Sequence, residues 1–335
     1  MSVTIRDVAR AAGVSTATAA RALGGYGHAS PAARRKVSES ARVLGYRPNV
    51  VARALVSRAT TTVGLVVGDI ENPFFAAAAR GLADVMDAHG YTVLLANADE
   101  DAERERRAVD ALRARQVDGM VVVPAPGASP GHLADLVAAE VPLVLLDRVV
   151  AGVEADSVLV RNTAGAHAAV AHLIRLGHRR IGVVSDLPEI TSSAERIGGY
   201  RRALRAAGIG VDPGLLSVGG PTQADGEAAA RRLLDRRDRP TAVFTANNFM
   251  TVGALRAARA LGLAIPGDVA LVGFDDLDWT TLVQPPVTVV SQPVAELGRT
   301  AGLRLLRRLE GDRSPARRIR LEARLIVRGS CGASP

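Results

Sequence analysis

Hydrophobic residues recur at helical spacing near the start of the chain, and this pattern predicts short helices. Thr4 and Asp7 have the spacing of a capping box, which marks the start of a first helix. Gly13 permits the turn that follows, and Ser15 caps a second helix. Two helices joined by a turn of three to four residues that contains glycine form a helix-turn-helix unit.

A third helix is predicted to begin at Ser30-Pro31 and to run through Leu44 to Gly45, because proline suits the first helical position. Three such helices can enclose a small core. The apolar positions on their common faces include Ile5, Val8, Ala9, Ala12, Ala19, Ala22, Leu23, Val37 and Ala41.

From Thr62 onward the pattern changes to short apolar runs that alternate with helical segments. Nearly continuous Val and Leu runs between helices predict parallel strands that are buried on both faces. The series restarts at Arg180, so we expect two doubly wound lobes that bind ligands at the carboxyl ends of their strands. The predicted strands are Thr62–Gly68, Tyr91–Asn97, Gly119–Pro124, Pro142–Asp147, Arg180–Ser185, Leu215–Val218, Thr241–Ala246 and Val269–Asp275.

The net charge is concentrated at the amino-terminal end of the chain. Residues 1–58 contain ten Lys/Arg and two Asp/Glu, whereas residues 59–335 contain 32 of each kind. A small basic head on a neutral body is typical of a protein that binds a polyanion. Because a helix-turn-helix places its second helix in the major groove, the predicted target is double-stranded DNA.

Side chains at the start of the second helix are expected to meet base edges. Arg21 can bridge two acceptors on guanine, and the small residues Thr16 and Ala17 can make hydroxyl contacts or touch thymine methyl groups. The alternative is that the segment only begins an ordinary helix hairpin. The charge asymmetry favours DNA binding.

A short amphipathic stretch, Val50–Val56, follows the third helix and is too short to be a stable isolated helix. Such a segment can fold when something holds it, and Leu55 is placed to wedge into a minor groove and kink the duplex. The alternative interpretation is a plain linker between domains.

The chain resembles the LacI/GalR (lactose repressor) family of transcription regulators from its first helix to almost its last strand. The motifs that carry the resemblance are VTIRDVARAAGVSTATAAR, GYRPNVVARAL, GHRRIG, AERIGGY, TANN and VGFDD. The resemblance implies a homodimeric repressor that binds a pseudo-palindromic operator and is released by a small-molecule effector, a sugar or related metabolite. Gly24 departs from the asparagine that is usual in the family. The residues predicted to contact DNA are Thr4, Ser15, Thr16, Ala17, Thr18, Arg21, His28, Ser30, Asn49, Arg53 and Leu55.

The predicted fold class is α/β, with a three-helix head and a hinge helix joined to a two-lobed, doubly wound body like that of periplasmic binding proteins. The expected boundaries are 1–47 for the head, 48–60 for the hinge and 61–335 for the effector-binding and dimerisation body. The resemblance implies three crossings between the lobes, near residues 161, 290 and 322. The amino-terminal lobe would then comprise about 61–161 and 291–321, and the carboxy-terminal lobe about 162–290 and 322–330.

Polar and aromatic residues near strand ends are the expected effector contacts. Arginine, amide and carboxylate groups can together bind vicinal hydroxyls in a largely apolar cleft, and phenylalanine can stack on a ring; the alternative for the two phenylalanines is core packing. The body departs from common family residues at Pro221, where several members have an aromatic residue, and at Asn248, where aspartate is common. The predicted set is Phe74, Phe75, Arg196, Asn247, Asp275 and Gln292.

Other classes of function find little support in the sequence. The segment Gly127–Gly131 matches the G-x-S-x-G pattern of esterases, but Pro130 lacks the backbone N–H that an oxyanion hole requires. We predict no catalytic residue, no cofactor and no metal site, because no nucleotide loop or cysteine cluster occurs. One cysteine, no apolar run of 18 residues and no signal peptide predict a cytoplasmic protein rather than a membrane or exported transport protein. An α/β enzyme and a regulator whose ligand promotes DNA binding stay open as alternatives.

Overall fold

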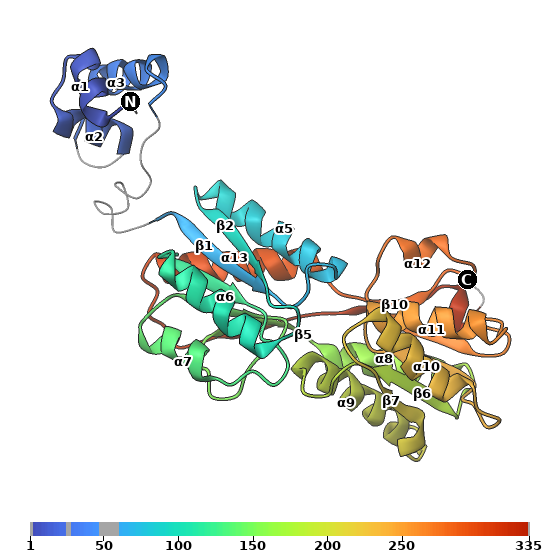
Figure 1. Ribbon diagram of the computed structural model, residues 1–335. Helices are drawn as coiled ribbons and strands as arrows, with labels where there is room; N and C mark the ends of the chain where they lie inside the picture. Colours follow the sequence, from blue (N-terminus) through green and yellow to red (C-terminus); the bar gives the residue numbers. More distant parts are fainter. Residues whose placement is uncertain (1–2, 25–27, 47–59, 334–335) are drawn as a thin grey trace. The chain divides into compact units, whose positions relative to one another are not determined.

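The computed structural model describes residues 3–24, 28–46 and 60–333. The chain forms two compact units, residues 1–62 and residues 63–335 (Figure 1). Three residues of the predicted hinge, Asn49, Arg53 and Leu55, lie outside the described residues.

Three helices form the head, as the hydrophobic pattern predicts: α1 (Ile5–Ala12), α2 (Thr16–Gly24) and α3 (Pro31–Val43). Thr4 and Asp7 make both bonds of the capping box, and Ser15 Oγ accepts the backbone N–H three residues later at 3.1 Å. The prediction for α3 was wrong at its end, because the helix stops at Val43 and Leu44 is its C-cap. Apolar residues from all three helices form the core of the head: Val8, Ala9, Ala12, Ala19, Val37 and Ala41.

The first sheet of the body has six strands in the order β11-β5-β4-β3-β1-β2. Buried apolar residues form a cluster on each face of this sheet: α5 and α13 cover one face, and α6 and α7 cover the other. The strands are β1 (Thr62–Val67), β2 (Thr92–Asn97), β3 (Gly119–Val122), β4 (Leu143–Leu146), β5 (Asp156–Val160) and β11 (Arg318–Leu321). The helices are α5 (Pro73–Ala88), α6 (Ala102–Ala114), α7 (Gly131–Ala138) and α13 (Val294–Leu309).

The second sheet also has six strands, in the order β12-β10-β9-β8-β6-β7, with β12 antiparallel to β10. Helices α8 and α9 cover one face, and α10 and α11 the other. The strands are β6 (Ile181–Ser185), β7 (Leu216–Val218), β8 (Ala242–Thr245), β9 (Ala270–Phe274), β10 (Thr288–Ser291) and β12 (Arg324–Ile326). The helices are α8 (Asn162–Arg175), α9 (Thr191–Ala206), α10 (Gln223–Leu234), α11 (Asn248–Ala260) and the short α12 (Trp279–Leu282).

The chain passes between the two sheets three times: after β5, after β10 and between β11 and β12. Each lobe is therefore built from segments that are distant in the sequence, and three connecting segments join the lobes. Such an arrangement is suited to hinge closure around a ligand. The predicted fold class, a helix-turn-helix head with a doubly wound two-lobed body, is confirmed.

Helices on the same face of a sheet approach closely at glycine residues. A Cβ atom added to Gly298 of α13 would lie 1.9 Å from the carbonyl oxygen of Ala78 in α5. A Cβ atom added to Gly199 of α9 would lie 2.5 Å from the carbonyl oxygen of Thr163 in α8. Both distances are far below van der Waals contact, so only glycine permits these helix pairs to pack as they do.

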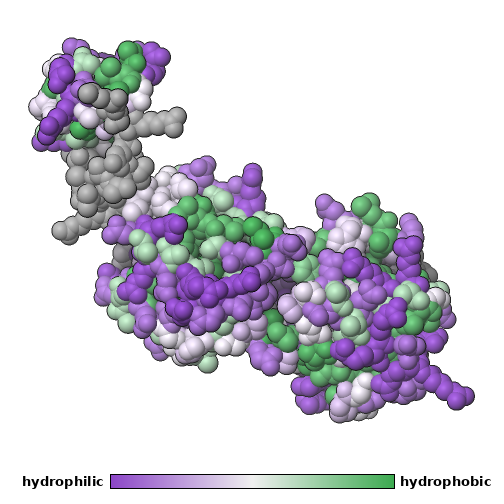
Figure 2. Space-filling model, in the orientation of Figure 1, coloured by the Kyte–Doolittle hydropathy of each residue, from purple (hydrophilic) through white to green (hydrophobic). Residues whose placement is uncertain are grey.

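The face of the molecule in Figure 2 is largely hydrophilic, with smaller apolar patches between the polar side chains. The large apolar residues that are exposed are scattered along the chain and include Ile70, Leu95, Leu282 and Leu303. Within the described ranges, none of the helices is long and apolar enough to cross a membrane.

Candidate functional sites

The start of α2 presents the side chains that the sequence predicts to read bases. Thr16, Ala17 and Arg21 are all exposed, whereas Thr18 is half-buried and its hydroxyl lies 2.9 Å from that of Ser15. Ser15 Oγ is thus engaged in capping the helix, and its O–H can donate to a phosphate when the Thr18 hydroxyl is the donor in the pair. We conclude that Thr16, Ala17 and Arg21 form the accessible surface of this helix end.

Other predicted DNA contacts lie around this helix. His28 and Ser30 are exposed, and Ser30 caps α3 by accepting the backbone N–H of Ala33 at 3.2 Å. Thr4 is exposed and held in the capping box of α1. The predicted contacts in the hinge cannot be placed, since they fall outside the described residues.

The acidic residues of the head are already paired with arginines. Asp7 lies 3.6 Å from Arg10, and Glu39 lies 2.6 Å from Arg42. Among the described residues of the head, the remaining cations are exposed and in excess over the acids: Arg6, Arg21, Arg34, Arg35 and Lys36. This excess positive charge is available to neutralise phosphates.

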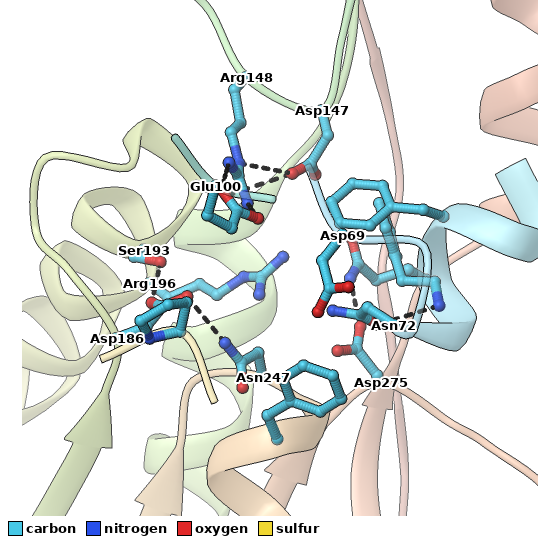
Figure 3. A pocket seen from close by; sticks show the side chains of 16 residues that line it. Asp69, Asn72, Glu100, Asp147, Arg148, Asp186, Ser193, Arg196, Asn247 and Asp275 are labelled. Carbon is cyan, nitrogen blue, oxygen red and sulfur yellow. Dashed lines mark hydrogen bonds and ion pairs between the residues drawn. The ribbon is translucent and has the colours of Figure 1, made fainter. Parts of the chain in front are cut away.

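A polar pocket lies in the body, lined by residues that follow strands of both sheets. Glu100, Asp147 and Arg148 lie together at the top of the view in Figure 3, and the other labelled residues surround the space below them. Counted together with the solvent-open space at its mouth, the pocket has a volume of about 490 Å³. The lining residues are Asp69, Asn72, Phe74, Phe75, Glu100, Asp147, Arg148, Asp186, Ser192, Ser193, Arg196, Pro221, Asn247, Phe249, Asp275 and Gln292.

The first lobe contributes an arginine and a carboxylate that follow β4 directly. Arg148 is held by Glu100 through two bonds of 2.6 and 2.9 Å, and its Nη1 also donates to the carbonyl of Pro124 at 3.1 Å. Burial alone would lower the pKa of Arg148, but Glu100 raises it above the ordinary arginine value, so Arg148 is a fixed cation. Asp147 accepts the hydroxyl of Ser192 in the other lobe at 3.3 Å. Burial raises the pKa of Asp147, against the effect of the nearby arginines.

Arg196 of α9 is the second cation in the pocket, and it is 5% exposed. Its Nε donates to Asn162 Oδ1 at 2.8 Å, and its Nη1 donates to the carbonyl of Ala246 at 2.7 Å. The guanidinium carbon also lies 3.9 Å from the centroid of the Phe274 ring. These contacts fix the plane of the guanidinium and leave Nη2 for a ligand.

The second lobe holds a buried carboxylate, Asp186, at the end of β6. Its two oxygens accept hydrogen bonds from Ser193 Oγ and from Asn247 Nδ2, the latter at 2.8 Å. Asn247 is also the N-cap of α11 and accepts the N–H of Met250 through Oδ1. Burial raises the pKa of Asp186, although the bond from Ser193 and the charge of Arg148 oppose this.

Asp275 and Gln292 connect the end of β9 to the second crossing between the lobes. Gln292 Nε2 donates to Asp275 Oδ1, and Asn248 donates to Asp275 Oδ2 through its backbone N–H and its Nδ2 at 2.9 and 3.1 Å. Asn248 Nδ2 also lies 3.0 Å from Oδ1 of Asn72 in the first lobe. The asparagine at position 248 therefore bridges the lobes, which an aspartate could not do as a donor.

Phe74 and Phe75 combine the two roles that the sequence left open. Both line the pocket and both belong to the core of the first lobe, with exposures of 6% and 3%. Their rings meet edge to face at 5.2 Å, and Arg148 lies 5.9 Å from the centroid of Phe75. Pro221 and Phe249 are the apolar residues of the second lobe in the pocket.

Three buried polar atoms of the pocket make no hydrogen bond within the described residues: Asp147 Oδ1, Arg148 Nε and Gln292 Oε1. A buried polar atom without a partner costs about 1–3 kcal/mol, so such atoms are usually satisfied by water or a ligand. Two of the three are acceptors and one is a donor. This set of atoms complements a molecule with several hydroxyl groups.

All six residues predicted as effector contacts line this one pocket. The prediction omitted several residues that line it too, and these mostly follow strand ends: Asp69, Glu100, Asp147, Arg148 and Asp186. The rule that ligands bind at the carboxyl ends of parallel strands would have selected them, because each lies within three residues of a predicted strand. Ser192, Ser193 and Phe249 lie on helices and had no such signal.

A DNA-binding head and a two-lobed body with a polar pocket define a ligand-responsive regulator of transcription. The model of bacterial regulatory proteins of the lacI family matches residues 4–49, and that of the periplasmic binding protein-like domain matches residues 170–331. The repressor CytR of Escherichia coli K12 is 35% identical over 335 residues, which cover 99% of this chain and 97% of CytR.

Two solved structures resemble the whole chain. A complex of the regulator CelR with cellobiose is 35% identical, covers 98% of this chain and 99% of its own, and has a TM-score of 0.75. The lac repressor dimer bound to operator and the anti-inducer ONPF is 27% identical, covers 99% of this chain and 100% of its own, and has a TM-score of 0.88.

The chain belongs to the LacI family. It is a DNA-binding transcriptional regulator with an effector-binding body, and it is not an enzyme.

Proposed function

We propose that the protein is a cytoplasmic repressor that binds a pseudo-palindromic operator as a homodimer and is released by a neutral sugar. The family supplies the class of regulator, and the relatives named above include a repressor and a cellobiose-bound regulator. The proposed division is a head of residues 1–47, a hinge of 48–60 and a body of 61–335, with lobes of 61–161 with 291–321 and 162–290 with 322–330.

The observation that supports a sugar best is the set of three buried atoms without a hydrogen bond, Asp147 Oδ1, Arg148 Nε and Gln292 Oε1. Hydroxyl groups can donate to the two acceptors and accept from the guanidinium nitrogen. Arg196 and Asn247 are placed beside them, and Phe74 and Phe75 offer apolar surface for the face of a ring.

The charge of the pocket argues for a ligand without phosphate. Five carboxylates line the pocket (Asp69, Glu100, Asp147, Asp186 and Asp275), against two arginines. Of the two cations, Arg148 is already neutralised by Glu100 at 2.6 Å. A phosphate would meet a net negative lining, so a phosphorylated sugar should bind far more weakly than its neutral parent.

On the DNA side, we propose that Thr16, Ala17 and Arg21 read bases and that the other predicted residues grip the backbone. Exposure of these three side chains at the start of α2 supports this assignment. Operator symmetry follows from the symmetry of a dimer, and the similar lac repressor structure is a dimer bound to operator. Leu55 is proposed as the wedge between base pairs.

The experiment is an anisotropy titration of the full-length protein against a duplex that it selects from a random library. Ribose, glucose, cellobiose and glucose 6-phosphate are then added to the complex. We expect one neutral sugar to weaken operator binding at least tenfold and the phosphate ester to have no effect. In Asn247→Ser, which keeps a residue suited to the helix cap, the response should be lost while the sugar-free operator affinity is unchanged.

Three results would contradict parts of the proposal. If only the phosphorylated sugar acted, the charge argument would be wrong; if the sugar strengthened operator binding, the ligand would be a corepressor. A slope of affinity against salt near zero would remove the phosphate-contact argument for the head.

A further inference from the structure

Asn162 occupies the first crossing between the lobes, directly after β5, and its side chain is almost fully buried. Its Oδ1 accepts the Nε–H of the pocket residue Arg196 at 2.8 Å. Its Nδ2 donates to Oε2 of Glu195 at 3.2 Å and to the carbonyl of Val160 at 3.4 Å. A residue of the first crossing between the lobes therefore holds the arginine of the pocket.

Glu195 connects the same group to the other lobe. Its Oε1 accepts Nη1 of Arg320 at 3.0 Å, and Arg320 belongs to β11 of the first sheet. β11 ends just before the third crossing, whereas Glu195 is on α9 of the second lobe. The carboxylate of Glu195 thus links two crossings, and through Asn162 it reaches the pocket.

The orientation of the Asn162 amide depends on Glu195. An amide can present either its oxygen or its NH₂ to a neighbour, and the hydrogen-bond network decides which. The carboxylate accepts from Nδ2, and this directs Oδ1 toward the guanidinium of Arg196. Without an acceptor at position 195, only the longer bond of 3.4 Å to the carbonyl of Val160 holds the amide in this orientation.

We propose that Glu195 is a positioning residue that couples ligand binding at Arg196 to closure of the two lobes. One oxygen fixes Arg196 through Asn162, and the other closes the lobes through Arg320. The ligand half of this proposal rests on the proposed sugar site, whereas the closure half concerns the ligand-free protein.

Two substitutions of Glu195 separate the effect on ligand binding from the effect on closure of the lobes. Glu195→Ala removes both acceptors, whereas Glu195→Gln keeps one oxygen for Asn162 and places an NH₂ group toward Arg320. A matched control is Glu227→Ala on α10: its side chain is 32% exposed, against 29% for Glu195, and it pairs only with Arg231 of the same helix at 3.7 Å.

Sugar affinity of the full-length protein is measured by calorimetry with the sugar identified above, and hydrogen exchange is measured without ligand at residues 160–165 and 320–324. We expect Glu195→Ala to bind the sugar about tenfold more weakly, the value of a hydrogen bond to a charged group. Glu195→Gln should bind within about threefold of wild type. Both variants should exchange faster than wild type in the crossing segments, and Glu227→Ala should change neither measurement.

The proposal is overturned if exchange in the crossing segments is the same in Glu195→Ala, Glu227→Ala and wild type. It is also overturned if Glu195→Ala and Glu195→Gln lose sugar affinity equally, since a merely structural role would not distinguish them. If wild type binds no sugar, the proposed function fails, and the exchange measurement alone decides whether Glu195 closes the lobes.

Discussion

Two adjacent glycines of α9, Gly198 and Gly199, should respond to alanine in opposite directions. A Cβ atom at Gly199 would lie 2.5 Å from the carbonyl oxygen of Thr163 and 2.7 Å from the Cβ of Ala166, both in α8. A Cβ atom at Gly198 would meet nothing within 4 Å. Neither glycine has a positive φ, so both positions accept the backbone of alanine and differ only in the space around them.

The magnitudes follow from two opposing terms. Replacing glycine by alanine inside a helix stabilises the folded state by about 0.5–1 kcal/mol, because glycine loses more backbone entropy on folding. Gly198→Ala should show this gain in full. In Gly199→Ala the new methyl must move from 2.5 Å to beyond 3.0 Å from backbone, so the two helices must separate. Overpacking costs about 1–3 kcal/mol, and because the clashes are with backbone and Cβ atoms the cost should be about 2–3 kcal/mol, which leaves a net loss of about 1–2 kcal/mol.

Thermal unfolding followed by the fluorescence of Trp279, the single tryptophan, reports on the body. For a body of this size, 1 kcal/mol shifts Tm by about 2–4 °C. Gly198→Ala should therefore melt about 1–4 °C above wild type and Gly199→Ala about 2–8 °C below it. If both variants were stabilised, or if Gly198→Ala were the less stable one, the packing argument would be refuted.

Three further predictions concern charged groups. Burial raises the pKa of Asp147 despite the nearby arginines, so ionisation of this carboxyl destabilises the folded state. Asp147→Asn should therefore raise Tm at pH 7, and the increase in Tm should become smaller as the pH falls toward 3.8. In calorimetry the same variant should bind the sugar more weakly. Burial by itself would raise the pKa of Asp156, but hydrogen bonds from two arginines and a backbone N–H lower it. The ionised carboxylate therefore stabilises the folded state, and this contribution is lost as the pH falls below 3.8. In urea unfolding, Asp156→Asn should cost about 3–5 kcal/mol at pH 7 and much less in acid; an equal cost at both would contradict this. Arg21→Ala should weaken binding to the selected operator about tenfold and relax the preference for one guanine, read from a set of single-base duplex variants.

Strands with long apolar runs could be predicted from the sequence, and the remaining strands could not. All eight predicted strands occur, with ends that differ by at most two residues. Six of them are interior strands, which must be apolar throughout because helices cover both faces, and β2 and β7 are edge strands. The predictions missed β5, β10, β11 and β12. β11 reads RIRL and β12 reads RLI, and both lie at sheet edges where one side is open to polar residues.

The pocket was predictable in part for a similar reason. Asn247 and Asp275 end segments that carry a recognisable motif, so they could be identified by resemblance. Asp147 and Asp186 follow equally clear strands and carry no motif, so only the rule that ligands bind at the carboxyl ends of parallel strands would have selected them. Glu195 could not be predicted at all, since its importance comes from Asn162 and Arg320, which are 33 and 125 residues away.

Backbone strain supports the view that this pocket is built for a ligand. Glu100, Asp147 and Asp275 all line it, and all have positive φ values of 53°, 63° and 76°, a conformation that costs a residue with a side chain about 1–3 kcal/mol. Asp147 adds a buried oxygen without a hydrogen bond and a carboxylate whose pKa burial raises. Each of these features lowers the stability of the ligand-free body, and a bound polyol would relieve the unpaired atoms. Ligand binding and closure of the lobes should therefore stabilise the body more than the count of new hydrogen bonds alone implies.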